Sequence, residues 1–233
     1  MRVSVSSFLV AMALVVSNPA SALEPEDGGF AYDYPTELSV HPQLVSLLEA
    51  RKSERKAQFQ EDVDALKGEE AANNLDSQTD WEIKSQTDRL MVLVSSNYVY
   101  SGGAHGMFWS DAILWDKAKQ TEVSFLDLFT NKDEAKKLIL PAYCAMLDAE
   151  RLGMRGEPTP KDDLFGECVD PFEHGIAYPT NLGANGYLRI TFALPPYSAG
   201  PYVEGEYAFD IAAPSYITDK LKPEYKELFQ IYM

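Results

Sequence analysis

The residues best suited to chemistry lie in a glycine-rich stretch, residues 100–106, which contains Tyr100 and His105. Three glycines within five positions allow the backbone to adopt positive φ or to approach another group closely. An imidazole in such a bend could act as a general acid, a general base or a metal ligand. A bend between two strands whose histidine binds only a backbone carbonyl would explain the same residues. We favour the bend, because no serine, cysteine or carboxylate is tied to His105 by sequence.

A second stretch, residues 195–205, is rich in proline and glycine and contains Tyr197 and Tyr202. Its composition indicates a rigid connection, so the two tyrosine rings would have little residual freedom. Rigid, amphipathic tyrosines make good contact residues for a partner, at a low cost in conformational entropy. The same rings could instead cap the core while their hydroxyls bond locally, and both interpretations stay open. With Tyr100 and His105, these tyrosines are the candidate binding residues.

Acidic residues gather around one histidine, at Glu167, Asp170, Glu173 and His174. Their oxygen atoms could hold a divalent cation. Because the spacing matches no known calcium loop, we expect solvated loop acids and no metal site.

Motifs of several enzyme classes are missing from the sequence. It contains no phosphate-binding loop, no Gly-x-Ser-x-Gly elbow and no His-Glu-x-x-His. A metal-dependent polysaccharide deacetylase needs an aspartate and two histidines at helical spacing. The three histidines, His41, His105 and His174, are too far apart to form such a pair. We therefore expect no cofactor, and an enzymatic function is the less favoured interpretation.

Two cysteines, Cys144 and Cys168, are the only ones in the chain. In an oxidising compartment such a pair is more often bridged than free, so we predict a disulfide. Closing this loop of 25 residues would stabilise the fold by about 3.5 kcal/mol on the chain-entropy model. The bridge would pin the loop between Gly153 and Gly166. A reactive thiol would need a nearby base, and the sequence nominates none.

The first 22 residues have the features of a cleaved signal peptide. Arg2 supplies a positive charge, residues 8–16 form a short apolar run, and residues 20–22 are a small-residue cleavage site. The apolar run is too short to span a bilayer, which needs about 20 residues. Leu23 follows the cleavage site, so the lipid-modified cysteine of a bacterial lipoprotein is missing. We expect cleavage after Ala22 and a periplasmic or secreted protein without a stable membrane anchor.

The chain is strongly acidic. Without residues 1–22, 19 basic side chains face 36 acidic ones, which gives a net charge of −17. Such a chain repels nucleic acid and anionic lipid, and it attracts cationic partners. Acidity that merely keeps an exported protein soluble is the simpler explanation, because net charge governs solubility and association but not the fold. We therefore expect no nucleic-acid partner.

Hydrophobic periodicity predicts the elements that must position these residues. A helix extends over residues 43–66, and a helical region closes the chain at 216–229. A second helix follows a Thr130–Asp133 capping box, and Pro141 should kink or restart it. Alternating apolar residues predict strands at 81–83, 90–100, 105–115, 121–125, 187–194 and 206–211. Residues 151–180 should form a long loop. This order predicts an α+β fold, with an antiparallel sheet and helices packed on one face.

Residues 100–106, 125–129 and 196–205 together resemble an exported bacterial domain of unknown function. That domain occurs in the anti-sigma factor RsiV and beside the catalytic domain of PdaC-type peptidoglycan deacetylases. Residues 30–35 and the helix at 43–66 resemble the small PdaC-like domain that usually precedes it. The resemblance implies a PdaC-like region at 23–78 and a non-catalytic RsiV-like α+β domain at 79–233.

In RsiV this region recognises lysozyme, a strongly basic protein, and an acidic chain would suit such a partner. We find no cytoplasmic sigma-binding segment, no retained membrane helix and no deacetylase catalytic domain in the sequence. The resemblance therefore implies neither anti-sigma signalling nor deacetylation.

Three functions stay open. The leading hypothesis is a non-catalytic binding module of the cell envelope that recognises a cationic protein such as lysozyme, or peptidoglycan. The second is an envelope hydrolase with His105 as acid or base, which a carboxylate or hydroxyl within hydrogen-bond reach would favour. The third is a structural or assembly protein without a small-molecule site. Clustering of Tyr98, Tyr100, Tyr197 and Tyr202 in one exposed patch would favour a protein interface.

Overall fold

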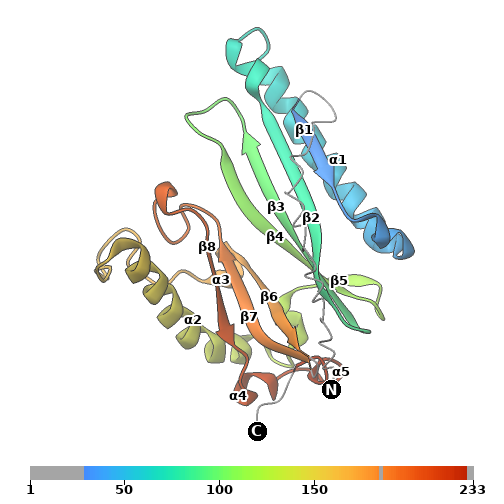
Figure 1. The fold of residues 1–233 in the computed structure, drawn as a ribbon, viewed down its shortest axis with the longest axis vertical. Coiled ribbons are helices and arrows are strands. Elements are labelled where there is room, and N and C mark those ends of the chain that lie inside the picture. Colours follow the sequence, from blue (N-terminus) through green and yellow to red (C-terminus); the bar gives the residue numbers. More distant parts are fainter. Residues whose placement is uncertain (1–28, 184–185, 230–233) are drawn as a thin grey trace, which may run out of the picture.

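Two β-sheets form the centre of the computed structural model, which describes residues 29–183 and 186–229 (Figure 1). The larger sheet has the strand order β1-β2-β3-β4-β5, with bounds Phe30–Asp33, Asp76–Gln86, Leu90–Tyr100, Met107–Asp116 and Thr121–Val123. The smaller sheet has the order β6-β7-β8, with bounds Ile176–Gly183, Gly186–Leu194 and Tyr207–Ala212. Neighbouring strands are antiparallel except β1 and β2, which are parallel.

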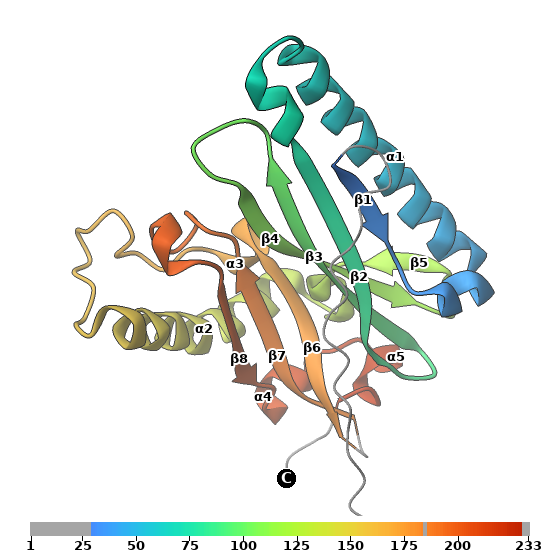
Figure 2. The same cartoon turned by 45° about the horizontal axis from the view of Figure 1, so that its top comes forward.

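Two long helices cover the sheets from outside, as Figures 1 and 2 show. Helix α1 (Pro42–Ala65) lies along the larger sheet, and α2 (Lys132–Arg155) lies along the smaller one. The connections contain the short helices α3 (Pro171–His174), α4 (Ser215–Thr218) and α5 (Pro223–Lys226), and 3-10 turns at Thr36–Val40, Glu70–Asn74, Phe125–Leu128 and Tyr202–Glu204. The predicted α+β class is confirmed, with two sheets in place of one.

Strand β3 is buried on both faces, which explains its continuous apolar run. Leu90, Val92 and Val94 pack into the larger core, together with β6–β8 and α2. Met91 and Leu93 point the other way, into a smaller core under α1. Side chains alternate along a strand, so neighbouring residues of β3 serve different cores. The larger sheet thus joins the two halves of the molecule.

Helix α2 corrects three expectations. Its N-cap is Asn131, whose side chain accepts a hydrogen bond from the Glu134 N–H at 3.1 Å, so the predicted Thr130 cap is wrong. The helix continues through Pro141 and does not restart there, while a kink at Pro141 stays a prediction. The predicted loop at 151–180 is shorter, because α2 runs to Arg155 and both α3 and the start of β6 lie within that range. Gly156, at φ 76°, ends α2 in a left-handed conformation that favours glycine.

Other boundaries also differ from the sequence patterns. The closing helical region is two short helices, with Pro223 in the first turn of α5. Residues 78 and 79, between which the domain boundary is predicted, both lie in β2, and the division into two domains stays a prediction. Among the described helices, none is both long and apolar enough to cross a membrane. The predicted signal peptide at residues 1–22 lies outside the described residues.

Candidate functional site

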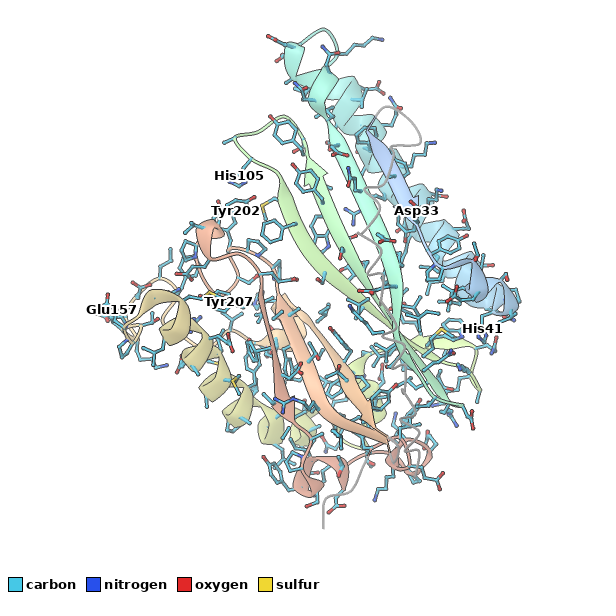
Figure 3. All side chains as sticks on the ribbon, viewed as in Figure 1. Asp33, His41, His105, Glu157, Tyr202 and Tyr207 are labelled. Atoms are coloured by element: carbon cyan, nitrogen blue, oxygen red, sulfur yellow. A yellow bond between two sulfur atoms is a disulfide. The ribbon has the colours of Figure 1, made fainter. Side chains whose placement is uncertain are left out.

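The structure brings His105, Tyr197 and Tyr202 together, although two of them lie more than 90 residues from the first in sequence. Figure 3 shows His105 beside Tyr202. His105 is exposed in the loop between β3 and β4. Its Nδ1 lies 3.0 Å from the carbonyl oxygen of Gly106, and its Nε2 lies 3.2 Å from the Tyr197 hydroxyl. Its ring stacks on Tyr202 with a centroid separation of 3.9 Å. Two separate loops are therefore held in contact by aromatic side chains.

Tyr202 also holds the two loops together through its hydroxyl group. Its hydroxyl donates a hydrogen bond to the Gly106 carbonyl at 2.7 Å. Gly106 is buried, and a Cβ there would overlap the ring of Tyr98, so only glycine allows this approach. Phe108 lies opposite Tyr98 in the β3–β4 register and packs edge-on against Tyr202, at 5.8 Å between ring centroids.

Ring contacts join His105, Phe108, Tyr197 and Tyr202, and Tyr98 lies beside them, opposite Phe108 and against Gly106. We call these five residues the aromatic patch: Tyr98, His105, Phe108, Tyr197 and Tyr202. Tyr98 is 37% exposed and Tyr197 is 50% exposed, so part of the patch faces solvent.

Tyr100 has a different place. Its hydroxyl donates to the Gly103 carbonyl at 2.9 Å, within its own loop, and its side chain is half-buried. It therefore braces the β3–β4 loop, and no ring contact joins it to the aromatic patch among the described residues. Of the four candidate binding residues, the structure brings three into one cluster.

Tyr197 adopts an unusual backbone conformation, with φ of 70°. A bulky residue in this left-handed region is rare and strained, and such residues cluster at functional sites. The conformation holds the Tyr197 hydroxyl against His105 while half of the side chain stays exposed.

The last two turns of α2 hold the tyrosine loop in place. Arg155 donates two hydrogen bonds to the Glu204 carboxylate, at 2.7 and 2.8 Å, and the bonds from Arg155 lower the pKa of Glu204. The Tyr207 hydroxyl donates to the same carboxylate, and burial together with this bond raises the pKa of Tyr207 to about 12. Arg151, fully buried, donates to the Ala199 carbonyl at 3.0 Å. The loop is therefore fixed by charged side chains of a rigid helix.

Carboxylates crowd together on the same face of the larger sheet as Tyr98. Asp33 and Asp80 are direct partners in the parallel β1–β2 register, and Glu82 is the next residue on that face of β2. Burial raises the pKa of Asp80, and the charges of Asp33 and Glu82 raise it further. Lys84 pairs with Glu82, but no described cation forms an ion pair with Asp33 or Asp80. We call Asp33, Asp80 and Glu82 the carboxylate ledge.

The chemistry available at His105 is limited. Its hydrogen-bond partners are a phenol and a backbone carbonyl. Within the described ranges no carboxylate bonds the imidazole, and no serine or cysteine does. A phenol is a poor nucleophile unless a base removes its proton. The arrangement is suited to stacking and hydrogen bonding with a partner.

The acidic cluster at 167–174 is an ion-paired loop. Asp170 caps α3 by accepting from the Phe172 N–H at 3.0 Å. Lys136 pairs with Asp170, and with Glu173 at 3.3 Å, and the bond to Asp170 raises the pKa of Lys136. In the part of the chain that the structure describes, no three His, Cys, Asp or Glu residues are arranged to hold a metal ion.

Cys144 and Cys168 form the predicted disulfide, with 5.5 Å between their Cα atoms. The bridge joins α2 to the loop that precedes α3. Beside it, Arg151 donates to the Glu167 carbonyl at 3.1 Å. The loop is thus tied to the same helix that holds the tyrosine loop.

Residues 30–108 match the family model of the deacetylase PdaC. This segment is less than half of the chain, and it includes Tyr98, His105 and Phe108 of the aromatic patch but neither Tyr197 nor Tyr202. The RsiV-like assignment of the C-terminal part stays a prediction. A search of curated proteins found no match.

Two crystal structures resemble the fold. One is a DUF3298 family protein from Pseudomonas aeruginosa PAO1, with 20% identity, 82% of each chain covered and a TM-score of 0.51. The other is a DUF3298 family member from Bacteroides fragilis NCTC 9343, with 14% identity, 84% of this chain and 73% of that chain covered, and a TM-score of 0.48. The first similarity shows a shared fold, with no transfer of activity at this identity.

Proposed function

We propose that this protein is an exported, non-catalytic binding module of the bacterial cell envelope that recognises a cationic protein such as lysozyme. The clustering of the aromatic patch carries the proposal. Three of its rings, from two loops far apart in sequence, are held by hydrogen bonds or stacking before any partner binds. Pre-organised tyrosines bury large area at low entropic cost, as in other recognition surfaces.

The carboxylate ledge supports a cationic partner. Like charges directly opposite one another in a sheet are unfavourable, and no described cation offsets Asp33 or Asp80. A lysine- or arginine-rich surface placed there would relieve the repulsion. The net charge of −17 expected for the exported chain would also steer a basic protein toward it.

Binding to immobilised lysozyme tests the proposal. We expect capture at low ionic strength that weakens steeply toward physiological salt. Tyr202→Ala should weaken capture at least about tenfold, because it removes the ring between His105 and Phe108. The control is Tyr216→Ala, which truncates an exposed tyrosine on α4, outside the aromatic patch. Absence of capture even at low salt, or an equal loss in both variants, would show that the aromatic patch does not bind lysozyme.

Peptidoglycan is the alternative ligand, and hydrolysis is the second candidate function. The contact between His105 and the Tyr197 hydroxyl favours hydrolysis, because it is the hydroxyl partner that an acid–base mechanism requires. Incubation with purified sacculi separates these two cases. Co-sedimentation without soluble products indicates peptidoglycan binding, and release of soluble fragments that His105→Ala abolishes indicates hydrolysis.

A further inference from the structure

A cavity of about 190 Å³ lies between the second half of α1 and the larger sheet. Phe59, Val99, Met107 and Trp109 form its apolar wall, and Arg55 and Ser77 contribute polar groups. Met107 and Trp109 flank Phe108 along β4, so this cavity lies on the sheet face opposite the aromatic patch. We call it the α1 pocket.

The sequence explains why a cavity forms here. Under the first half of α1, the large residues Trp81, Leu93 and Ile113 meet Leu44 and Leu48 of the helix. Toward the other end of the sheet, the residues on the same face include Ser77 and Thr79. Small polar residues cannot fill the space that large apolar ones fill.

Ser77 has an unsatisfied hydroxyl in the α1 pocket. Its side chain belongs to a residue only 2% exposed, and its Oγ has no hydrogen-bond partner among the described residues. A buried hydroxyl without a partner is unfavourable, and such exceptions call for an explanation.

Arg55 offers free donors at the same pocket. Its guanidinium carbon lies 4.8 Å from the centre of the Trp109 ring. No described carboxylate lies within ion-pair distance of it, whereas Arg51, one turn earlier, pairs with Glu122 at 2.8 Å. Stacking on an indole orients a guanidinium and leaves its in-plane N–H groups available to an acceptor.

We propose that the α1 pocket binds a carboxylate carried on a small apolar group, such as the terminal carboxylate of a short peptide. A guanidinium matches the two oxygens of a carboxylate, the Ser77 hydroxyl would supply a further donor, and the apolar wall would hold the substituent. The volume suits a small group, since a cavity of roughly 150 Å³ accommodates benzene. Asp62 also lines the pocket, where it accepts a hydrogen bond from Gln58 at 3.5 Å. Its negative charge would repel an anionic ligand.

Two probes of equal size test the charge of the ligand. N-acetylalanine carries the carboxylate, and N-acetylalaninamide replaces it with a neutral amide. We expect saturable shifts of the Trp109 indole and Met107 methyl NMR signals with N-acetylalanine, with a Kd on the order of 1 mM for so small a ligand. The amide should bind at least about tenfold more weakly, because it lacks the charge that Arg55 would pair with.

Variants separate recognition from folding. Arg55→Gln should weaken N-acetylalanine binding about tenfold, and the matched control Arg51→Gln should leave it unchanged. Ser77→Ala should raise the thermal midpoint, because it removes the unpaired hydroxyl, and yet weaken binding several-fold. Asp62→Asn should strengthen binding about twofold by removing a like charge.

A separate comparison of ligands distinguishes the two possible sources of the carboxylate. Tighter binding of N-acetylalanylalanine than of butyrate would indicate a peptide terminus, and the reverse order would indicate a free short-chain acid. The proposal is wrong if neither N-acetylalanine nor butyrate saturates, which would indicate a pocket that holds only water. It is also wrong if the amide binds equally or if Asp62→Asn weakens binding. Lysozyme capture plays no part in this test, so the two proposals can fail separately.

Discussion

At the scale of single residues, the site combines a strained backbone with a rigid side chain. Tyr197 is one of two described non-glycine residues with positive φ, the other being Gln120 in the turn before β5. Glycine would adopt this conformation more easily, since the left-handed region costs about 1–2 kcal/mol for other residues. The tyrosine ring must therefore contribute something that glycine lacks, and half of the side chain is exposed. We interpret the backbone strain at Tyr197 as the energetic cost of holding its ring exposed to solvent.

Substitution of Tyr197 tests this interpretation. Both Tyr197→Gly and Tyr197→Ala remove the ring and should weaken partner capture equally. The glycine variant should be more stable than the alanine variant by about 1 kcal/mol, although glycine is usually the less stable of the two. Urea denaturation of both variants measures the difference. An alanine variant as stable as the glycine variant would show that the backbone at Tyr197 is not strained.

The sequence pointed to the right segments but not to their contact. Glycine near His105 and proline near Tyr197 and Tyr202 identify two rigid loops. The stacking of His105 on Tyr202 depends on how β4 and β8 are placed in space, and no local pattern encodes it. The sequence already groups Tyr98 with Tyr197 and Tyr202 as a possible exposed patch, and Tyr98 lies on the same face of β3 as Tyr100. The Tyr100 hydroxyl donates to the Gly103 carbonyl within its own loop, and residue spacing alone could not indicate this contact.

At the scale of elements, one buried carboxylate joins the end of β4 to the C-terminal helices. Asp116 accepts hydrogen bonds from Arg89 at 2.8 and 2.9 Å and from the Tyr225 hydroxyl at 2.6 Å. It also accepts from the N–H groups of Ala118 and Lys119 in the following turn. Burial by itself would raise the pKa of Asp116, but the bonds from Arg89 and Tyr225 outweigh it and lower the pKa to about 2.

This pKa predicts how stability depends on pH. Because the pKa is lower in the folded state than the unfolded value of about 3.9, the contribution of Asp116 is complete above pH 4 and is lost as the pH falls toward 2. Asp116→Asn should lower the free energy of unfolding by about 3 kcal/mol at neutral pH, since it leaves Arg89 without its partner. The gap between the variant and the natural chain should narrow between pH 4 and pH 2.

Urea denaturation at several pH values measures the gap. Asp88→Asn, at an exposed position next to Arg89, is the control and should leave stability nearly unchanged. A gap that stays constant down to pH 2 would mean that Asp116 contributes no pH-dependent stability.

The elements themselves were predictable where one physical signal dominates. The 3.6-residue pattern of 43–66 and the alternation at 187–194 correspond to α1 and β7. Helix α2 does not restart at Pro141, because a single interior proline removes one backbone bond while the buried face of α2, with Ile139 and Tyr143, keeps its packing. The parallel pairing of β1 with β2 depends on where α1 returns the chain, so it could not be inferred from either strand alone.

At the scale of the whole molecule, the two sheets share one core through β3. Leu90, Val92 and Val94 belong to the same core as Tyr143 and Phe192 of the other half, while their neighbours pack under α1. Tertiary contacts of this kind couple the stability of one half to the other. The disulfide lies in the half that contains α2, far along the chain from the α1 core.

The three tryptophans allow a direct test of this coupling. Trp81, Trp109 and Trp115 all lie on the face of the larger sheet that packs against α1, so their fluorescence reports on that half alone. Replacing Cys144 and Cys168 by alanine should lower the free energy of unfolding by about 3.5 kcal/mol. Because the core is shared, tryptophan fluorescence should follow the same shifted urea transition as far-UV circular dichroism. Separate transitions, with the fluorescence midpoint unmoved, would show that the halves unfold independently and that β3 does not couple them.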